Sequence, residues 1–112
     1  MPILSENINN VSIILVDVKR ATVVVAEDFK SIVQNELSNG SSNFIFDLKT
    51  NEFIDSTFLA AIVISYKKII ENNGQLKIVG FRPAVRSMFE LTNLSKIFDV
   101  YDNEQEALMS FN

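Results

Sequence analysis

The feature that most constrains the fold is an alternation of strand-like and helix-like segments in the middle of the chain. Residues 44–48 form a short, mostly apolar run, residues 56–72 carry an apolar stripe at helical spacing, and residues 76–79 are apolar again. The Asn73-Gly74 pair ends the helical segment with a turn signal. Two strands joined by a helix of this length pair in parallel, because a long crossover returns the chain to the same end of the sheet.

Further elements extend this alternation to both ends of the chain. β-branched residues predict a strand over 11–18. Thr22 is a capping residue for a helix over 24–37, although Val23-Val24-Val25 also has strand propensity. The other expected elements are an edge strand over 1–6, a helix over 83–92, a strand over 97–101 and a helix over 103–111. We therefore expect one α/β domain over residues 1–112, with a small mixed, mostly parallel β-sheet and about four helices packed on it.

Composition limits the chemistry that such a domain can perform. None of the 112 residues is cysteine or histidine, which excludes disulfides and thiolate ligands and removes the commonest general base and metal ligand. The net charge is −4, and the sequence has no basic block, so nucleic-acid phosphates have no obvious binding surface. We expect no enzymatic activity, no cofactor and no nucleic-acid partner, and a function that consists of binding another protein.

The distribution of apolar residues also bears on location. Residues 1–6 lack the positive region and the long apolar stretch of a secretory signal. The longest apolar run, residues 58–64, is far shorter than the ~20 residues that a membrane-spanning helix needs. These observations predict a cytoplasmic protein without direct membrane insertion.

Residues 53–59, where a loop enters the helix over 56–72, are the most informative segment. Asp55, Ser56 and Thr57 are residue types that satisfy free backbone amides at the start of a helix. A phosphorylation switch is the alternative interpretation, because a phosphoryl group on Ser56 would add about −1.5 to −2 charges at a helix N-terminus. A docked partner would then meet a solvated dianion while the domain keeps its fold. The residue types alone leave both interpretations open.

Several short motifs together resemble a known family. They are Phe46-Asp47-Leu48, Phe53-Ile54-Asp55-Ser56-Thr57 and Asn73-Gly74, followed by residues 76–86, 89–94 and 104–108. The combination is similar to STAS domains, which include sulphate-transporter tails and bacterial anti-sigma-factor antagonists. The resemblance covers residues 43–112 well and residues 11–42 loosely.

The resemblance implies a function and a set of site residues. In antagonists of this kind the serine directly after the aspartate is the phosphoacceptor, which is Ser56 here. The unphosphorylated form binds a serine kinase that acts as an anti-sigma factor and so frees a sigma factor. Phosphorylation ends this binding, and a phosphatase resets the protein. The resemblance also implies that Asp55, Thr57, Phe58 and Thr22 contact the partner.

Two departures from the family pattern support alternative functions. Family antagonists usually carry glycine two residues after the phosphoacceptor, where this chain has Phe58, and the loop over 16–22 has no glycine. We expect Phe53 and Phe58 to be partly exposed, and a large side chain at position 58 to narrow access to Ser56. One alternative is therefore a STAS scaffold without a phosphorylation switch, or the cytosolic subunit of an ABC-type lipid or solute transporter. A small-ligand carrier or enzyme is a second alternative, for which the sequence offers no convergent polar groups.

Two further groups of polar residues are candidate sites. Asp47, Glu52 and Asp55 lie close together in sequence, as a metal site or an acid/base pair would require. Solvated loop charges are the favoured interpretation, with no metal bound. Arg82 and Arg86 are residue types that hold phosphate, but basic residues at the start of a helix are usually solvated.

Overall fold

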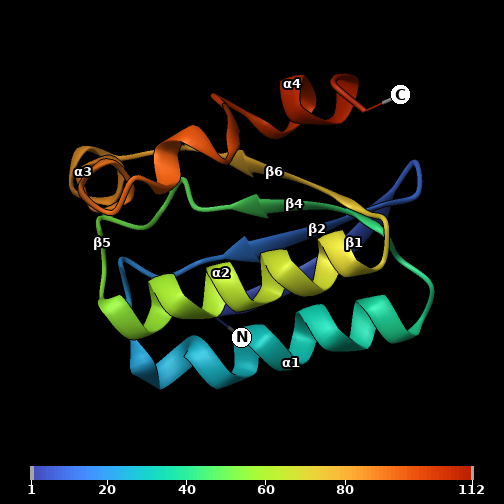
Figure 1. The fold of residues 1–112 in the computed structure, drawn as a ribbon, viewed down its shortest axis with the longest axis horizontal. Helices are drawn as coiled ribbons and strands as arrows, with labels where there is room; N and C mark the ends of the chain where they lie inside the picture. Colours follow the sequence, from blue (N-terminus) through green and yellow to red (C-terminus); the bar gives the residue numbers. More distant parts are fainter. Residues whose placement is uncertain (1, 112) are drawn as a thin grey trace.

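The computed structural model describes residues 2–111 and places them in a five-stranded sheet with helices on both faces (Figure 1). The strands of this sheet are β1 (Ile3–Ile8), β2 (Val11–Val16), β4 (Asn43–Asp47), β6 (Gln75–Val79) and β7 (Asp99–Tyr101). The helices are α1 (Val23–Ser38), α2 (Ser56–Glu71), α3 (Pro83–Leu91) and α4 (Glu104–Met109), with a 3-10 turn η1 (Leu94–Lys96). Every strand and helix expected from the sequence is present within residues 2–111, with ends that differ by at most two residues. The expected start of the edge strand, Met1, lies outside the described residues.

The order of the strands in the sheet is β1-β2-β4-β6-β7. β1 pairs antiparallel to β2, and the remaining pairs are parallel, which confirms the prediction of a mixed, mostly parallel sheet. Asn9 and Asn10 join the first two strands and both have positive φ values, 52° and 65°. Asparagine tolerates this conformation better than most residues and is typical of two-residue hairpin turns.

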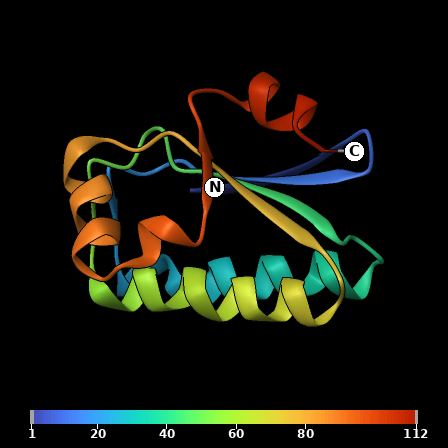
Figure 2. The ribbon, with the colours of Figure 1, turned by 45° about the horizontal axis from the view of Figure 1, so that its top comes forward.

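The two faces of the sheet are covered unequally. α1 and α2 lie side by side on one face, whereas α4 lies on the opposite face over β4, β6 and β7 (Figures 1 and 2). α3 packs near β5 at the end of the sheet where α2 begins (Figure 1). None of the helices within residues 2–111 is long and apolar enough to cross a membrane.

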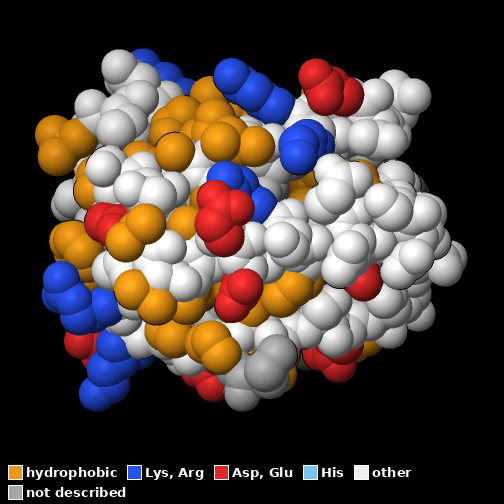
Figure 3. Space-filling model, turned by 90° about the horizontal axis from the view of Figure 1, so that it is seen from below, with side chains coloured by type: hydrophobic (Ala, Val, Ile, Leu, Met, Phe, Trp, Pro, Cys, Tyr) orange, Lys and Arg blue, Asp and Glu red, His pale blue; other side chains and the backbone are white. Residues whose placement is uncertain are grey.

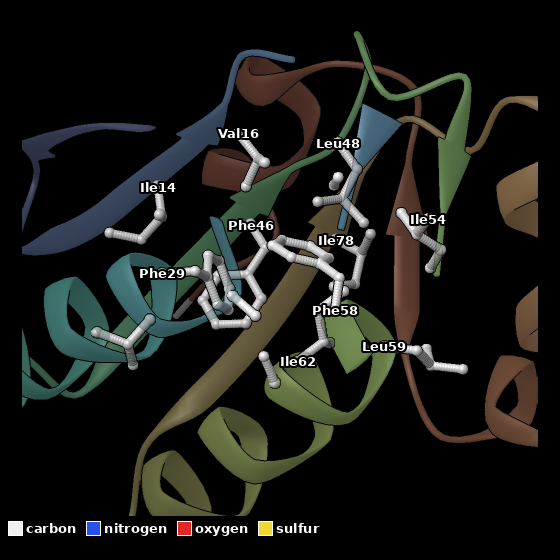
Figure 4. Close-up of a cluster of buried hydrophobic side chains, with 14 of the residues drawn as sticks. Ile14, Val16, Phe29, Phe46, Leu48, Ile54, Phe58, Leu59, Ile62 and Ile78 are labelled. Atoms are coloured by element: carbon white, nitrogen blue, oxygen red, sulfur yellow. The ribbon is translucent and has the colours of Figure 1, made fainter. Parts of the chain in front are cut away.

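The main core lies between the sheet and the pair α1 and α2 (Figure 4). Phe29 of α1, Phe46 of β4 and Phe58 of α2 are fully buried. The Phe29 ring lies 4.9 Å from Phe46 and 5.1 Å from Phe58 between centroids, within the range of favourable aromatic pairs. Burying each such side chain stabilises the fold by roughly 1.5–3 kcal/mol. Phe44, Phe89 and Phe98 are buried as well.

A second, two-stranded ladder was not predicted from the sequence. β3 (Arg20–Ala21) pairs in parallel with β5 (Phe53–Ile54). Two-residue strands carry no periodic pattern, so their residue types gave no signal. The ladder matters because it brings the residue that precedes α1 beside the residue that precedes α2, and it thereby sets the relative position of the two helix starts.

Candidate functional site

The starts of α1 and α2 are joined by the side chain of Asp55. The Asp55 backbone amide donates to the carbonyl oxygen of Ala21 at 3.1 Å, which continues the small ladder. One carboxylate oxygen, Oδ1, accepts a hydrogen bond from the Phe58 amide at 2.8 Å and caps α2. The other, Oδ2, accepts from the Val23 amide of α1 at 3.0 Å. A single carboxylate therefore satisfies free amides of two helices, and the capping interpretation of Asp55 is confirmed.

Ser56 is the first residue of α2, and its side chain is exposed. Thr57 beside it is exposed as well. The Ser56 hydroxyl forms no hydrogen bond with the other residues between 2 and 111, because Asp55 supplies the cap. The hydroxyl therefore lies open to solvent, at the positive end of a sixteen-residue helix that favours negative charge.

Phe58 corrects two expectations drawn from the sequence. Its side chain is 0% exposed and points into the core toward Phe29 (Figure 4), so the expectation of partial exposure is wrong. Because Phe58 lies on the same face of the helix as Leu59 and Ile62, it follows the buried stripe of α2. The aromatic ring does not cover Ser56. The buried ring also offers no surface to a partner, in contrast to the expectation that Phe58 contacts the partner.

Thr22 caps α1, as the sequence predicted. Its hydroxyl oxygen accepts from the Val24 amide at 3.4 Å, and its side chain is half-buried. This is a long hydrogen bond, so the stronger tie at the start of α1 is the one from Val23 to Asp55. The predicted contact between Thr22 and a partner stays a prediction.

Two valines beside Ser56 form an exposed apolar surface that the sequence reasoning missed. Val23 is 60% exposed and Val24 is 82% exposed, whereas Val25 is buried at 7%. Hydrophobic side chains gather on the side of the molecule where α1 and α2 begin, and the opposite end is mostly polar (Figure 3). Val25 and Phe29 define the buried face of α1. The spacing of a helix places Val23 and Val24 outside that face. We call Val23, Val24, Ser56 and Thr57 the helix-start surface.

Phe53 lies at the edge of the helix-start surface. Its side chain is partly exposed, as predicted, and the Arg20 guanidinium carbon lies 4.4 Å from the centre of its ring. That distance is typical of a cation–π contact. The pair holds a positive charge on the small β3–β5 ladder, immediately before Asp55.

Asp47, Glu52 and Asp55 do not form one site. Glu52 is exposed and Asp55 is a cap, but Asp47 is fully buried, so the expectation of a solvated charge is wrong for Asp47. Its position in β4 directs the side chain toward the face that α4 covers. Within residues 2–111, no group of three acidic side chains is arranged to hold a metal ion.

The two arginines considered for phosphate binding make contacts within the chain. The Arg82 Nε atom donates to the Lys49 carbonyl oxygen at 2.8 Å. The Arg86 guanidinium lies 5.7 Å from the centre of the Phe81 ring. Both side chains remain largely exposed, and a phosphate-binding role for them stays a prediction.

Comparison with known proteins identifies the family and agrees with the fold. The model of the STAS domain family matches residues 5–107. An anti-sigma F factor antagonist from Paenibacillus polymyxa is 33% identical over 59% of this chain, but the match spans only 56% of that relative. A candidate anti-sigma factor antagonist from Thermotoga maritima is 34% identical over 86% of each chain. The crystal structure of an anti-sigma factor antagonist from Mycobacterium paratuberculosis superposes with a TM-score of 0.84, at 26% identity over 96% of this chain and 91% of that one. The chain belongs to the STAS domain family.

Proposed function

We propose that this protein is an anti-sigma-factor antagonist in a phosphorylation-controlled partner switch. The unphosphorylated form binds a serine kinase that acts as an anti-sigma factor, and so frees a sigma factor in the cytoplasm. The kinase phosphorylates Ser56, the complex separates, and a phosphatase restores the hydroxyl. The observation that carries this proposal is the free, exposed Ser56 hydroxyl at the start of α2, beside the exposed Val23 and Val24. The names of the relatives support the same function.

The helix-start surface has the composition of a docking site. Exposed apolar side chains grouped on one part of a protein mark interaction surfaces, and Val23 and Val24 are 60% and 82% exposed. Burying both against a partner removes apolar area from water and favours the complex. Ser56 and Thr57 add hydroxyl groups that hydrogen-bond across an interface without the desolvation penalty of a charge.

Phosphorylation of Ser56 makes docking of a partner on the helix-start surface unfavourable. The phosphoryl group carries about −1.5 to −2 charges near neutral pH, so a partner would have to remove a strongly solvated group from water. Asp55 and the exposed Glu52 lie nearby in the chain and add negative charge. An interface that loses about 2.8 kcal/mol binds roughly 100-fold more weakly.

The fold tolerates the modification for two reasons. The Ser56 side chain lies outside the core, and Asp55 rather than Ser56 caps α2. The positive end of the helix also favours a negative group at this position. The phosphorylated domain is therefore expected to keep its structure while it loses its partner.

Phosphotransfer with intact-mass readout tests the assignment of Ser56. The protein is incubated with its cognate kinase and ATP, and the added phosphate mass is measured. We expect one phosphate on the native protein and on the matched control Thr57→Ala, and none on Ser56→Ala. Equal modification of Ser56→Ala and native protein would show that the phosphoacceptor lies elsewhere.

The scaffold and transporter-subunit alternatives depended on Phe58. Because this side chain is buried in the core, it no longer argues against access to Ser56. Affinity capture from the native host separates the possibilities. Recovery of a small GHKL-type kinase supports the proposal, and recovery of an ABC-type ATPase supports the transporter alternative.

A further inference from the structure

Two of the three glycines in the chain directly follow an asparagine, in the pairs Asn39-Gly40 and Asn73-Gly74. An asparagine before glycine can react with its own backbone, because glycine has no side chain that shields its amide nitrogen. That nitrogen attacks the side-chain carbonyl carbon of the asparagine, and the side-chain amide is finally converted to a carboxylate. In a folded protein the reaction depends on how freely the two residues move, and the two pairs differ in this respect.

The first pair lies at the end of α1, in an open turn. The Gly40 amide donates to the Leu37 carbonyl oxygen at 3.0 Å. The Ser41 amide donates to the Glu36 carbonyl oxygen at 2.9 Å, which completes the Schellman arrangement of a helix C-terminus. Gly40 is exposed and has a φ of 99°, and apart from its chain neighbours no atom of residues 2–111 lies within 4 Å of the position that a Cβ atom would take. The Gly40 nitrogen can therefore leave its hydrogen bond and turn toward the Asn39 side chain without displacing other residues.

The second pair, after α2, is packed between a helix and a strand. Gly74 is buried, and its amide donates to the Ile69 carbonyl oxygen at 2.9 Å. A Cβ atom at this position would collide with the Ser42 carbonyl oxygen and would lie 2.9 Å from a methyl carbon of Ile69. The next residue, Gln75, begins β6 and donates its amide to the same Ser42 oxygen at 3.1 Å. Movement of the Gly74 nitrogen toward the Asn73 side chain therefore requires the end of α2 to separate from the loop before β4.

We propose that Asn39 is a site of spontaneous deamidation in the folded protein, and that the fold protects Asn73 from the same reaction. The Gly40 nitrogen loses its proton to water and forms a bond to Cγ of Asn39. The bond between Cγ and Nδ2 breaks and ammonia leaves, so that a succinimide ring remains. Water then opens the ring at one of its two carbonyl carbons. Breaking the bond from nitrogen to Cγ gives aspartate at position 39, and breaking the bond from nitrogen to the backbone carbonyl carbon gives isoaspartate.

The reaction places a new carboxylate at the end of α1, next to the β1–β2 hairpin (Figures 1 and 2). Asn39 lines a cavity of about 550 Å³, which is also lined by Glu36 and by the hairpin residues Asn9 and Asn10. The Glu36 carboxylate accepts a hydrogen bond from the buried Ser12 hydroxyl at 2.8 Å and so connects α1 to β2. A carboxylate three residues further along repels Glu36, and it lies at the negative end of the helix. The product should therefore loosen the last turn of α1.

Deamidation at Asn39 is independent of the proposed phosphorylation of Ser56, although both add negative charge. Asn39 follows the last residue of α1, a helix of sixteen residues that is roughly 24 Å long, whereas the helix-start surface lies at its other end. Phosphorylation adds about −1.5 to −2 charges, and deamidation adds about −1 charge. An acidic form of the protein that is separated by charge alone therefore does not identify which residue has changed.

Peptide mapping by mass spectrometry tests the proposal on the native chain. Folded protein is kept in mildly alkaline buffer, and the conversion of Asn39 and of Asn73 to the acid is followed over time. We expect Asn39 to react at least roughly ten times faster than Asn73, because Asn73 reacts only in molecules in which the end of α2 has opened. The matched control is the same chain unfolded in urea, in which both residues should react at similar rates. Equal rates in the folded protein, or an unreactive Asn39 under conditions in which the unfolded chain reacts, would overturn the proposal.

Variants connect the modified residue with the change in charge. Asn39→Gln keeps the amide but needs a larger ring, so the acidic form that native protein develops on storage without kinase should be largely lost on isoelectric focusing. Asn35→Gln replaces an exposed asparagine of the same helix that does not precede glycine, and this variant should develop the acidic form at the native rate. Persistence of the acidic form in Asn39→Gln would assign the new charge to another residue.

Discussion

Asp55 accepts a hydrogen bond from the Val23 amide at 3.0 Å, so the residue that precedes α2 holds the first residue of α1. The same carboxylate caps α2 through the Phe58 amide. The two helix starts consequently form one unit, in which the phosphoacceptor candidate Ser56 lies beside the exposed apolar residues Val23 and Val24. The proposed docking surface depends on this unit.

Removing the shared cap should destabilise the domain. Asp55→Ala leaves two helix amides without their acceptors, and we expect a loss of about 2–3 kcal/mol in the free energy of unfolding, measured with urea. Asp55→Asn retains one acceptor oxygen and should lose about half as much. Glu52→Ala, an exposed neighbour, should stay within about 0.5 kcal/mol of the native protein. A native-like Asp55→Ala would show that the two amides find other acceptors.

Loss of the exposed apolar surface should weaken binding without unfolding the protein. Val24 is 82% exposed, so Val24→Ser should leave the melting temperature nearly unchanged. Affinity for the kinase should fall about tenfold or more if Val24 lies at the centre of the interface. The matched control is Ile70→Ser, which removes a 46% exposed side chain at the other end of α2. Equal effects of the two substitutions on affinity would place the interface elsewhere.

Restoring the glycine that family antagonists usually carry at position 58 should harm this protein. Phe58 fills the core next to Phe29, so Phe58→Gly creates a cavity and adds a glycine to a helix, at a combined loss of about 4–6 kcal/mol. Phe58→Leu should lose much less and should be phosphorylated at the native rate, because Ser56 is already exposed. Faster phosphorylation of Phe58→Leu would show that the phenylalanine limits access to the hydroxyl.

Thermal stability should report the raised pKa of Glu104. Hydrogen bonding to Asp47, burial and the negative charge of Asp47 raise the pKa of Glu104 from 4.5 to about 7. The folded protein therefore binds more protons than the unfolded chain between these values, and the stabilising contribution declines as pH rises from 4.5 to about 7. Calorimetry should therefore give Glu104→Gln a higher melting temperature than the native protein at pH 8, with a smaller difference at pH 5. A constant difference at both pH values would mean that the substitution acts through packing alone.

The sequence predicted the strands and the long helices because their apolar residues repeat at the spacing of one buried face. It did not predict the β3–β5 ladder, whose two-residue strands are too short to show a period. The burial of Asp47 depends on its inward position at the end of β4 and on the packing of the distant α4 against that strand. The inward orientation of Phe58 follows from the apolar stripe of α2, on which it lies with Leu59 and Ile62, and the expectation of partial exposure rested on the unusual residue type alone. The exposure of Val23 and Val24 was not predicted either. Their residue types favour a strand, whereas their exposure follows from their positions on the helix α1.

The central claim is that a phosphoryl group on Ser56 separates the complex without unfolding the domain. Isothermal titration of the cognate kinase with unphosphorylated and Ser56-phosphorylated protein measures this directly, with circular dichroism to verify the fold of both forms. We predict at least a roughly 100-fold weaker Kd for the phosphorylated form and unchanged dichroism. Equal affinity of two folded forms would contradict the switch and leave only a scaffold role for the helix-start surface.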